Sequence, residues 1–242
     1  EDGRIRVGLE PVKGLTRAAV ESILEQRSRR PFASVADFVS RVDITQKEVE
    51  SLILCGAFDF TGRTRPRMMW EVKAGFAALR KAAGRGALFV AEGPADAPDL
   101  PEFPPEQRLR YEAEILELFV SRHPVELLRP WLRQHGFIEA RRIGLRLGRT
   151  VRVAGLLAAT RETDTKNNRG AMEFLTLEDE TGLVEVALFP AAYQRLRRRI
   201  EDAGPYLVTG VVDNQYGALS VNAQQLARFE PSALGQRAAG AA

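Results

Sequence analysis

Hydrophobic residues recur at helical spacing over residues 15–69, in the first third of the chain. The recurring positions are Val20, Ile23 and Leu24, then Val35, Phe38 and Val39, then Val49, Leu52 and Ile53. Because residues three and four apart share one face of a helix, this pattern predicts three or four short helices. Thr45 followed by Glu48 has the spacing of a capping box, and Ser34 followed by Asp37 is a weaker version of it, so both pairs indicate helix starts.

From Val151 onward the hydrophobic period changes to two, which is the spacing of β-strands. The predicted elements are the strands "VRVAGLLAAT", "MEFLTLED" and "LVEVALF", the helix "AAYQRLRRRIED", and the strands "YLVTGVVD" and "ALSVNAQQL". Three strands, a helix and two strands is the order of an OB-fold, a small closed barrel. Gly155 and Gly210 lie inside strands, where such a barrel bends. The predicted fold class is therefore α+β, with a helical region followed by a five-stranded OB-fold barrel.

Stretches without either period divide the chain. Residues 84–105 hold five prolines and read as a linker, and the last residues have nothing to bury. The predicted division is a helical region at residues 1–83, a linker at 84–107, a helical connector at 108–149, the barrel at 150–230 and a disordered tail at 231–242.

Alternation along the second predicted strand assigns its side chains to two faces. Leu175 and Leu177 point to the core, which leaves Phe174 on the outer face, directly after a polar and basic loop. The loop residues of interest are Lys166, Asn168 and Arg169. In this interpretation the charged and amide side chains of the loop contact phosphates while Phe174 stacks on a base. The stacking contact contributes roughly 1 to 3 kcal/mol of binding free energy. The alternative is a solvated hairpin loop, with Phe174 packed under a neighbouring segment.

A tight turn precedes the first predicted helix, in the sequence "PVKGLT". Gly14 can adopt a backbone conformation that other residues avoid, next to Lys13. Backbone N–H groups exposed at such a turn, beside a helix N-terminus, bind anions, and phosphate is the obvious anion. The alternative is a plain turn between helices.

Composition permits a nucleic-acid partner without requiring one. The chain has 242 residues, of which 45% are hydrophobic and 28% charged, and a net charge of +3. An apparent pI of about 9.2 leaves room for local basic patches. The single cysteine, Cys55, stands in an apolar run, so a buried thiol and a reducing cytoplasm are expected. No membrane span or signal peptide is expected, and a chain that starts at Glu1 rather than Met suggests a piece of something longer.

Residues for catalysis or for metal binding do not stand at useful spacings. His123 and His135 have no companion ligand nearby in the sequence, so both are expected to be structural. The acidic residues 178–180 are interpreted as turn chemistry, and no Asp-x-Asp pair, catalytic triad or P-loop is found. We therefore expect no catalytic residue, no metal and no cofactor in this chain. The run Arg195, Arg197, Arg198 and Arg199 is interpreted as a solvated helix face.

Five segments, in this order, resemble a known family: "IRVGLEPVKGLTRAAVESILEQR", "PFASVADFVSRVD", "KEVESLILCGAFD", "YEAEILELFVSRHPV" and "FLTLEDETGLVEVALFP". They are similar to the C-terminal half of bacterial DNA polymerase III alpha subunits, including their error-prone relatives. The resemblance covers Ile5 to about Phe229. It implies a tandem helix-hairpin-helix region that grips the duplex backbone, a short clamp-binding segment and an OB-fold near the single-stranded template.

The resemblance carries over residue by residue. Lys13 and Gly14 match the first hairpin, whereas Thr16 stands where the family usually has a second glycine. In the linker, Leu88 and Phe89 match the hydrophobic anchor of the clamp-binding segment, while Arg85 replaces the usual leading glutamine. The alternative is that Leu88 and Phe89 pin the linker to the helical region.

The partners that the resemblance implies are double- and single-stranded DNA, the sliding clamp and other replisome subunits. Polymerase activity would reside in sequence outside this chain. Two other classes stay open, namely a protein-interaction scaffold and an RNA-binding OB module.

Overall fold

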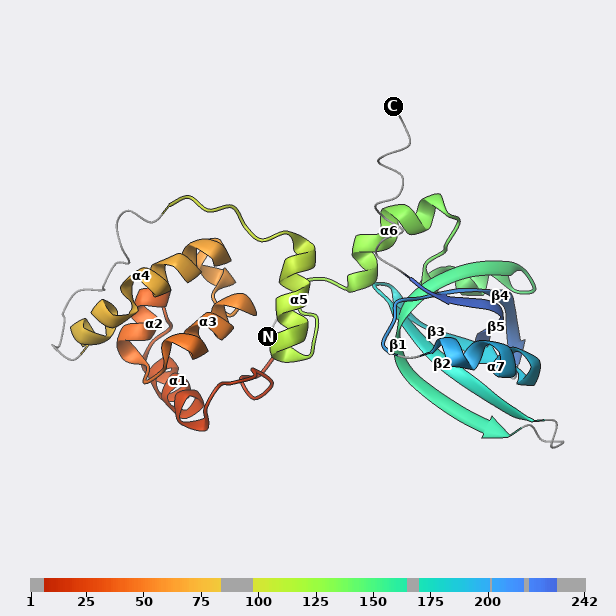
Figure 1. The fold of residues 1–242 in the computed structure, drawn as a ribbon, viewed down its shortest axis with the longest axis horizontal. Helices are drawn as coiled ribbons and strands as arrows, with labels where there is room; N and C mark the ends of the chain where they lie inside the picture. The colour runs from red at the N-terminus through yellow and green to blue at the C-terminus, as the bar shows by residue number, and fades with distance from the viewer. Residues whose placement is uncertain (1–6, 84–97, 165–169, 201, 216–217, 230–242) are drawn as a thin grey trace, which may run out of the picture. The chain divides into compact units, whose positions relative to one another are not determined.

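The computed structural model describes residues 7–83, 98–164, 170–200, 202–215 and 218–229 (Figure 1). The chain divides into two compact units, Glu1–Ser121 and Arg122–Ala242. The first is helical and the second contains the barrel, so the predicted α+β fold is confirmed.

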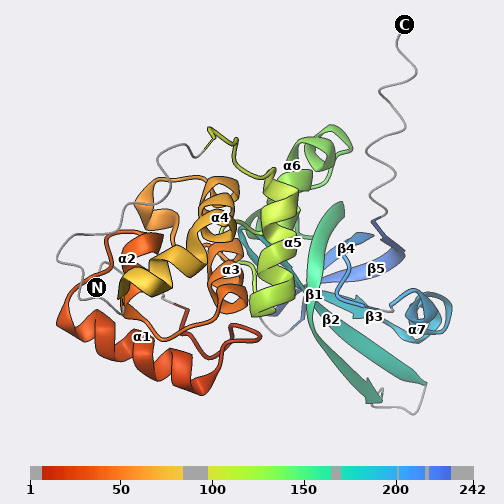
Figure 2. The same ribbon diagram turned by 60° about the vertical axis from the view of Figure 1, so that its left-hand side comes forward.

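The first unit is built from short helices whose starts follow the capping signals in the sequence. The elements are α1 (Arg17–Arg29), α2 (Val35–Arg41), α3 (Gln46–Leu54), η1 (Asp59–Thr61), α4 (Arg65–Ala83) and α5 (Pro105–Leu116). Ser34 caps α2, and Thr45 forms the predicted capping box with Glu48 at the start of α3. Helix α4 packs against α2 and α3, and α3 also contacts α5 (Figure 2). The predicted helical faces meet in the core, where Val39, Val49 and Ile53 are fully buried.

Cys55 lies in this same core. Burial raises the pKa of its thiol, which keeps the sulfur protonated and unreactive. The predicted buried thiol is thus confirmed.

The second unit closes a five-stranded barrel. Its elements are α6 (Pro124–Gln134), η2 (Ala140–Arg146), β1 (Thr150–Asp164), β2 (Ala171–Asp179), β3 (Gly182–Leu188), α7 (Pro190–Leu196), η3 (Arg197–Arg199), β4 (Tyr206–Gln215) and β5 (Ala218–Arg228). The strand order around the barrel is β1-β2-β3-β5-β4, with β3 and β5 parallel and the other pairs antiparallel. Helix α7 follows β3 and precedes β4, as in an OB-fold.

The side chains that alternation predicts to face the core lie inside the barrel. Leu175, Leu177 and Val186 are fully buried, whereas Phe174 faces outward and is half-buried. Gly155 and Gly210 stand where neighbouring backbone comes too close for a side chain. A Cβ on Gly155 would lie 2.8 Å from the Glu178 carbonyl oxygen, and the β4 register shifts at Gly210.

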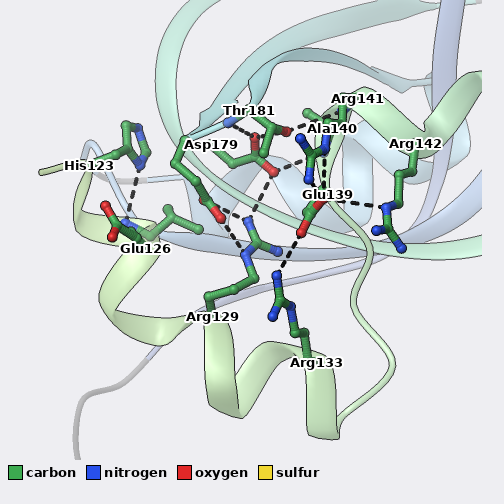
Figure 3. Close-up of polar contacts among 12 residues, drawn as sticks. His123, Glu126, Arg129, Arg133, Glu139, Ala140, Arg141, Arg142, Asp179 and Thr181 are labelled. Atoms are coloured by element: carbon green, nitrogen blue, oxygen red, sulfur yellow. Dashed lines mark hydrogen bonds and ion pairs between the residues drawn. The ribbon is translucent and has the colours of Figure 1, made fainter.

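An ion-pair network joins α6 to the turn between β2 and β3 (Figure 3). Arg129 lies 3.1 Å from Asp179 and 2.6 Å from Glu180, and both Arg129 and Asp179 are buried. Asp179 also accepts the Thr181 N–H at 2.7 Å, so the acidic residues 178–180 do supply turn chemistry. His123 accepts the Val125 N–H at the start of α6, which is a structural role.

The described residues contain neither a membrane-spanning helix nor a cluster of metal ligands. No described helix is long and apolar enough to cross a membrane. Within the same residues, no group of three or more His, Cys, Asp or Glu side chains could hold a metal ion.

Candidate nucleic-acid interface

The turn before α1 has a left-handed residue at its tip. Gly14 has φ 79°, and the Leu15 N–H donates to the Val12 carbonyl at 3.2 Å. A positive φ at the third position of such a turn is the signature of a type II turn, which favours glycine. A Cβ on Gly14 would meet nothing within 4 Å, so the requirement for glycine is conformational and the tip is open to a ligand.

The amides around this turn differ in their availability. The Lys13 N–H donates to the Ile115 carbonyl at 2.9 Å, and the Thr16 N–H donates to Glu48 Oε1 at 2.8 Å. The Gly14, Arg17 and Ala18 N–H groups have no acceptor among the described residues. Two donors at the N-terminus of α1 and one in the turn before it therefore remain for an anion.

Thr16 itself is a helix cap. Its Oγ1 accepts the Ala19 N–H at 3.2 Å, while Glu48 takes its amide. Burial alone would raise the pKa of Glu48, but hydrogen bonds from Thr16 and Thr45 outweigh it and lower the pKa from 4.5 to about 2. Thr16 thus holds the turn in place, and its own amide cannot serve a phosphate.

Lys13 is held beside the turn by an exposed ion pair. Its Nζ lies 2.6 Å from Glu117 Oε1, and the two side chains are 55% and 72% exposed. Because exposed pairs contribute little free energy, a phosphate can replace this carboxylate as the partner of Lys13.

On the barrel, the Arg161 side chain lies over the ring of Phe174 in a cation–π contact. The Arg161 guanidinium carbon lies 4.9 Å from the ring centroid, and β1 pairs Arg161 directly with Phe174. On the other side Phe174 pairs with Ala187 of β3, which is 1% exposed. A cation on an aromatic ring forms a flat platform on which a base can stack, and the cation also attracts phosphate.

The opposite face of the same β1–β2 pair is acidic. Glu162 pairs with Glu173, and Glu173 is buried with an Oε2 that has no partner among the described residues. Burial raises the pKa of Glu173, and nearby Glu162 adds to the effect, whereas Arg197 opposes it. The Phe174 face carries Arg161, but it also carries Glu178 of β2 and, across from Thr176, Glu185 of β3. The attraction for phosphate on this face is therefore local to Arg161.

The remaining predicted site residues lie outside the described residues. They are Lys166, Asn168 and Arg169 of the basic loop and Leu88 and Phe89 of the linker. Arg161 was missed by sequence reasoning. The signal that could have found it is the register, since Arg161 precedes the loop by about as many residues as Phe174 follows it.

Two family models match the chain. Residues 1–68 match a model described as a helix-hairpin-helix motif, and residues 151–227 match an OB-fold nucleic acid binding domain.

Curated relatives match nearly the whole chain. An error-prone DNA polymerase from Cutibacterium acnes is 31% identical over 94% of this chain and 20% of its own length. An error-prone DNA polymerase from Symbiobacterium thermophilum is 32% identical over 92% of this chain and 23% of its own length. The chain thus spans about a fifth of the length of these relatives and matches their C-terminal part.

Solved structures resemble it over smaller parts. A domain of replication protein A from Methanococcus maripaludis is 16% identical, with a TM-score of 0.30 over 36% of this chain and 89% of that domain. A match at this level adds nothing to the assignment.

Proposed function

We propose that this chain, a relative of the C-terminal part of bacterial error-prone DNA polymerases, is the DNA-binding portion of a DNA polymerase III alpha-type protein. Such a protein acts in DNA replication or in error-prone repair synthesis. The helix-hairpin-helix turn grips the duplex backbone, and the OB-fold binds the single-stranded template.

The observation that carries this proposal is the Arg161–Phe174 pair on the outer face of the barrel. The ring offers a base a stacking surface, and the guanidinium 4.9 Å from its centroid offers a positive charge to a nucleotide. Bases stack on such a surface whatever their identity, which suits a template whose sequence varies. In the sequence, Lys166 and Arg169 stand between β1 and β2.

The duplex part of the proposal rests on the Gly14 turn. Its free N–H groups and the exposed Lys13 offer one phosphate a set of neutral donors and one cation. Contacts of this kind position a protein on DNA without reading bases, which a polymerase requires as it moves.

Partners and location follow from the same assignment. We propose that Leu88 and Phe89 dock on the sliding clamp, that other replisome subunits bind the intact protein, and that it works in the bacterial cytoplasm, where its DNA lies. We also propose that nucleotide addition resides in sequence outside this chain, which spans 20% and 23% of the length of the two relatives.

Salt titration of binding to three labelled ligands tests the proposal. We expect the chain to bind a single-stranded oligodeoxynucleotide and a primed duplex, with affinity that falls steeply as salt rises, because each phosphate contact releases counterions. An RNA of the same sequence should bind more weakly. Preference for RNA would instead indicate an RNA-binding OB module. Affinity that ignores salt, or no binding of any of the three, would contradict the proposal.

A further inference from the structure

A groove of about 390 Å³ lies on the outer wall of the barrel formed by β1, β4 and β5. Its floor includes Leu207 and Thr209 of β4 and Ala227 of β5. This is a different part of the wall from the Phe174 face, which lies on β2. The groove and all of its lining residues belong to the second unit.

Three arginines stand around this groove. Arg152 of β1 continues a cross-strand row through Thr209 of β4 to Gln225 of β5. Arg195 and Arg199, from α7 and η3, reach the groove at the far edge of β5. Since neighbouring strands lie about 4.8 Å apart, the two rims are roughly 10 Å from each other, a width for one polynucleotide strand.

Each guanidinium is held in place by the protein through backbone carbonyls. Arg195 donates to the Gln224 carbonyl at 2.8 Å and Arg199 to the Leu226 carbonyl at 2.9 Å. Arg152 donates to the His135 carbonyl at 2.6 Å and lies over the Phe137 ring at 4.4 Å. These contacts use few of the five N–H donors of each guanidinium.

The charge of the groove is not neutralised. No acidic residue lines it, and none of its three arginines forms an ion pair within the described part of the chain. Neighbouring arginines are paired elsewhere, with Arg197 at 4.0 Å from Glu162 and Arg228 at 2.5 Å from Asp202. Three uncompensated guanidiniums in a concave surface attract an anion.

The carbonyls to which two of these arginines donate have a spacing that suits a polynucleotide. Gln224 and Leu226 are two residues apart in one strand, so their carbonyls are about 7 Å apart. That is close to the distance between successive phosphates of an extended single strand. The geometry points to a phosphodiester site: we infer that this groove binds two successive phosphates of a single-stranded nucleic acid at Arg195 and Arg199, with Arg152 on the opposite rim.

The inference deepens the proposed function, because it adds a second track for the strand on the barrel. A nucleic-acid strand bound at both the Phe174 face and this groove would run around the outside of the barrel instead of contacting it at a single face. The nucleotides between the two faces would make no stacking contact.

Matched variants of the full chain test the groove. Arg195→Gln with Arg199→Gln removes two charges from the groove. The control, Arg149→Gln with Arg198→Gln, removes two exposed arginines whose side chains form no hydrogen bond or ion pair within the described residues. Binding of a labelled oligothymidylate is measured at several salt concentrations. We expect the groove variant to reduce the slope of log affinity against log salt by about 1.4, which is two phosphates of a single strand, and the control to leave it unchanged.

A charge-retaining variant separates binding from folding. Arg195→Lys with Arg199→Lys should keep most of the wild-type slope, and circular dichroism should report the same fold for all variants. If the glutamine variant unfolds, Arg152→Gln on the other rim takes its place, with an expected loss of about 0.7 in slope. A wild-type slope in a folded groove variant overturns the inference.

Two further arms distinguish the possible failures. Phe174→Ala in the same titration tests the proposed single-strand face independently of the groove. If Phe174→Ala weakens binding but the groove variant does not change the slope, the groove inference fails and the proposed function stands. If the groove variant lowers the slope but Phe174→Ala binds as wild type does, the stacking role of Phe174 fails and the groove stands. Labelled polyglutamate and inorganic phosphate are tested as competitors. Displacement of the oligonucleotide by either one as effectively as by unlabelled oligothymidylate would mean that the groove takes an acidic peptide or a free anion, and would overturn the assignment to a polynucleotide.

Discussion

Glu48 accepts the backbone N–H of Thr16 through Oε1 and that of Thr45 through Oε2, both at 2.8 Å. One carboxylate thus serves the N-cap residues of α1 and α3 together. The capping box that the sequence predicts for α3 is therefore also what holds the turn at Gly14 against the rest of the helical unit.

Replacing Glu48 by glutamine should destabilise the helical unit. Glu48→Gln keeps the shape but loses the charge in two backbone hydrogen bonds, and bonds to a charged acceptor typically contribute about 1.5 to 3 kcal/mol. Chemical denaturation followed by circular dichroism measures the change. Glu21→Gln, which breaks only an exposed pair with Arg17, should cost less than about 0.5 kcal/mol. Equal effects of the two substitutions would contradict a special role for Glu48.

The same carboxylate makes stability depend on acid. Because the pKa of Glu48 is lowered from 4.5 to about 2, its contribution is present above pH 4.5 and is lost as the pH falls toward 2. The difference in unfolding free energy between wild type and Glu48→Gln should therefore shrink over this interval. Denaturation curves at several pH values measure it, and a difference that stays constant down to pH 2 would show that the pKa is not lowered.

In the ion-pair network between α6 and the barrel, only the buried pair of Arg129 and Asp179 should contribute substantially to the free energy of unfolding. Arg129→Ala leaves Asp179 buried without its cation, and breaking such a pair costs about 3 to 5 kcal/mol. Arg133→Ala removes a side chain that is 67% exposed and should cost less than about 1 kcal/mol. Thermal unfolding of both variants decides between them, and a small effect at Arg129 would mean that the barrel holds without this pair.

Substitutions at the Gly14 turn should weaken binding to duplex DNA. Gly14→Val strains a residue with φ 79° by on the order of 1 kcal/mol or more and moves the N–H donors. Lys13→Ala should also lower the salt slope by about 0.9, which is one phosphate of a duplex. Titrations on two duplexes of unrelated sequence measure both effects, which should be the same on each. Wild-type binding by folded variants would mean that this segment is only a turn.

Phe174→Ala should weaken binding to single-stranded DNA without unfolding the barrel. The ring is half-buried on the outer face and its loss leaves the interior residues untouched. A loss of roughly 1 to 3 kcal/mol in binding free energy is expected. Fluorescence anisotropy with a labelled oligonucleotide gives the value. Leu183→Ala, at another exposed apolar position of the barrel, is the matched control, and it should bind as wild type does.

Local patterns in the sequence were sufficient to predict much of the fold. The caps at Ser34 and Thr45, the inward Leu175 and Leu177 and the order of strands and helix are all confirmed. Each depends on residues a few positions apart, where helix and strand geometry fix which side chains share a face.

The contacts that shape the candidate sites depend on distant residues and were not predictable in this way. Thr16 and Glu48 are 32 positions apart, and Lys13 meets Glu117 from a different helix end. On the barrel, a register shift between Leu157 and Ala159 changes the pairing of the first part of β1 with β2. Periodicity contains no information about such pairings. Glu117 therefore emerges only from the folded chain, and Arg161 could have been found only by counting the strand register back from the loop.

The parallel pairing of β3 with β5 runs over three residue pairs, from Glu185–Ser220 to Ala187–Asn222, whereas β4 and β5 pair along nearly their whole length. The barrel is thus a long curled sheet that is closed by a short parallel pairing. Because only three residue pairs join β3 to β5, we expect this junction to open more readily than the other strand pairs. Arg195 and Arg199 donate to carbonyls of β5 just beyond it. A nucleic-acid strand bound across those arginines would therefore also stabilise the closed barrel. Binding at the groove and closure of the barrel would then be thermodynamically linked.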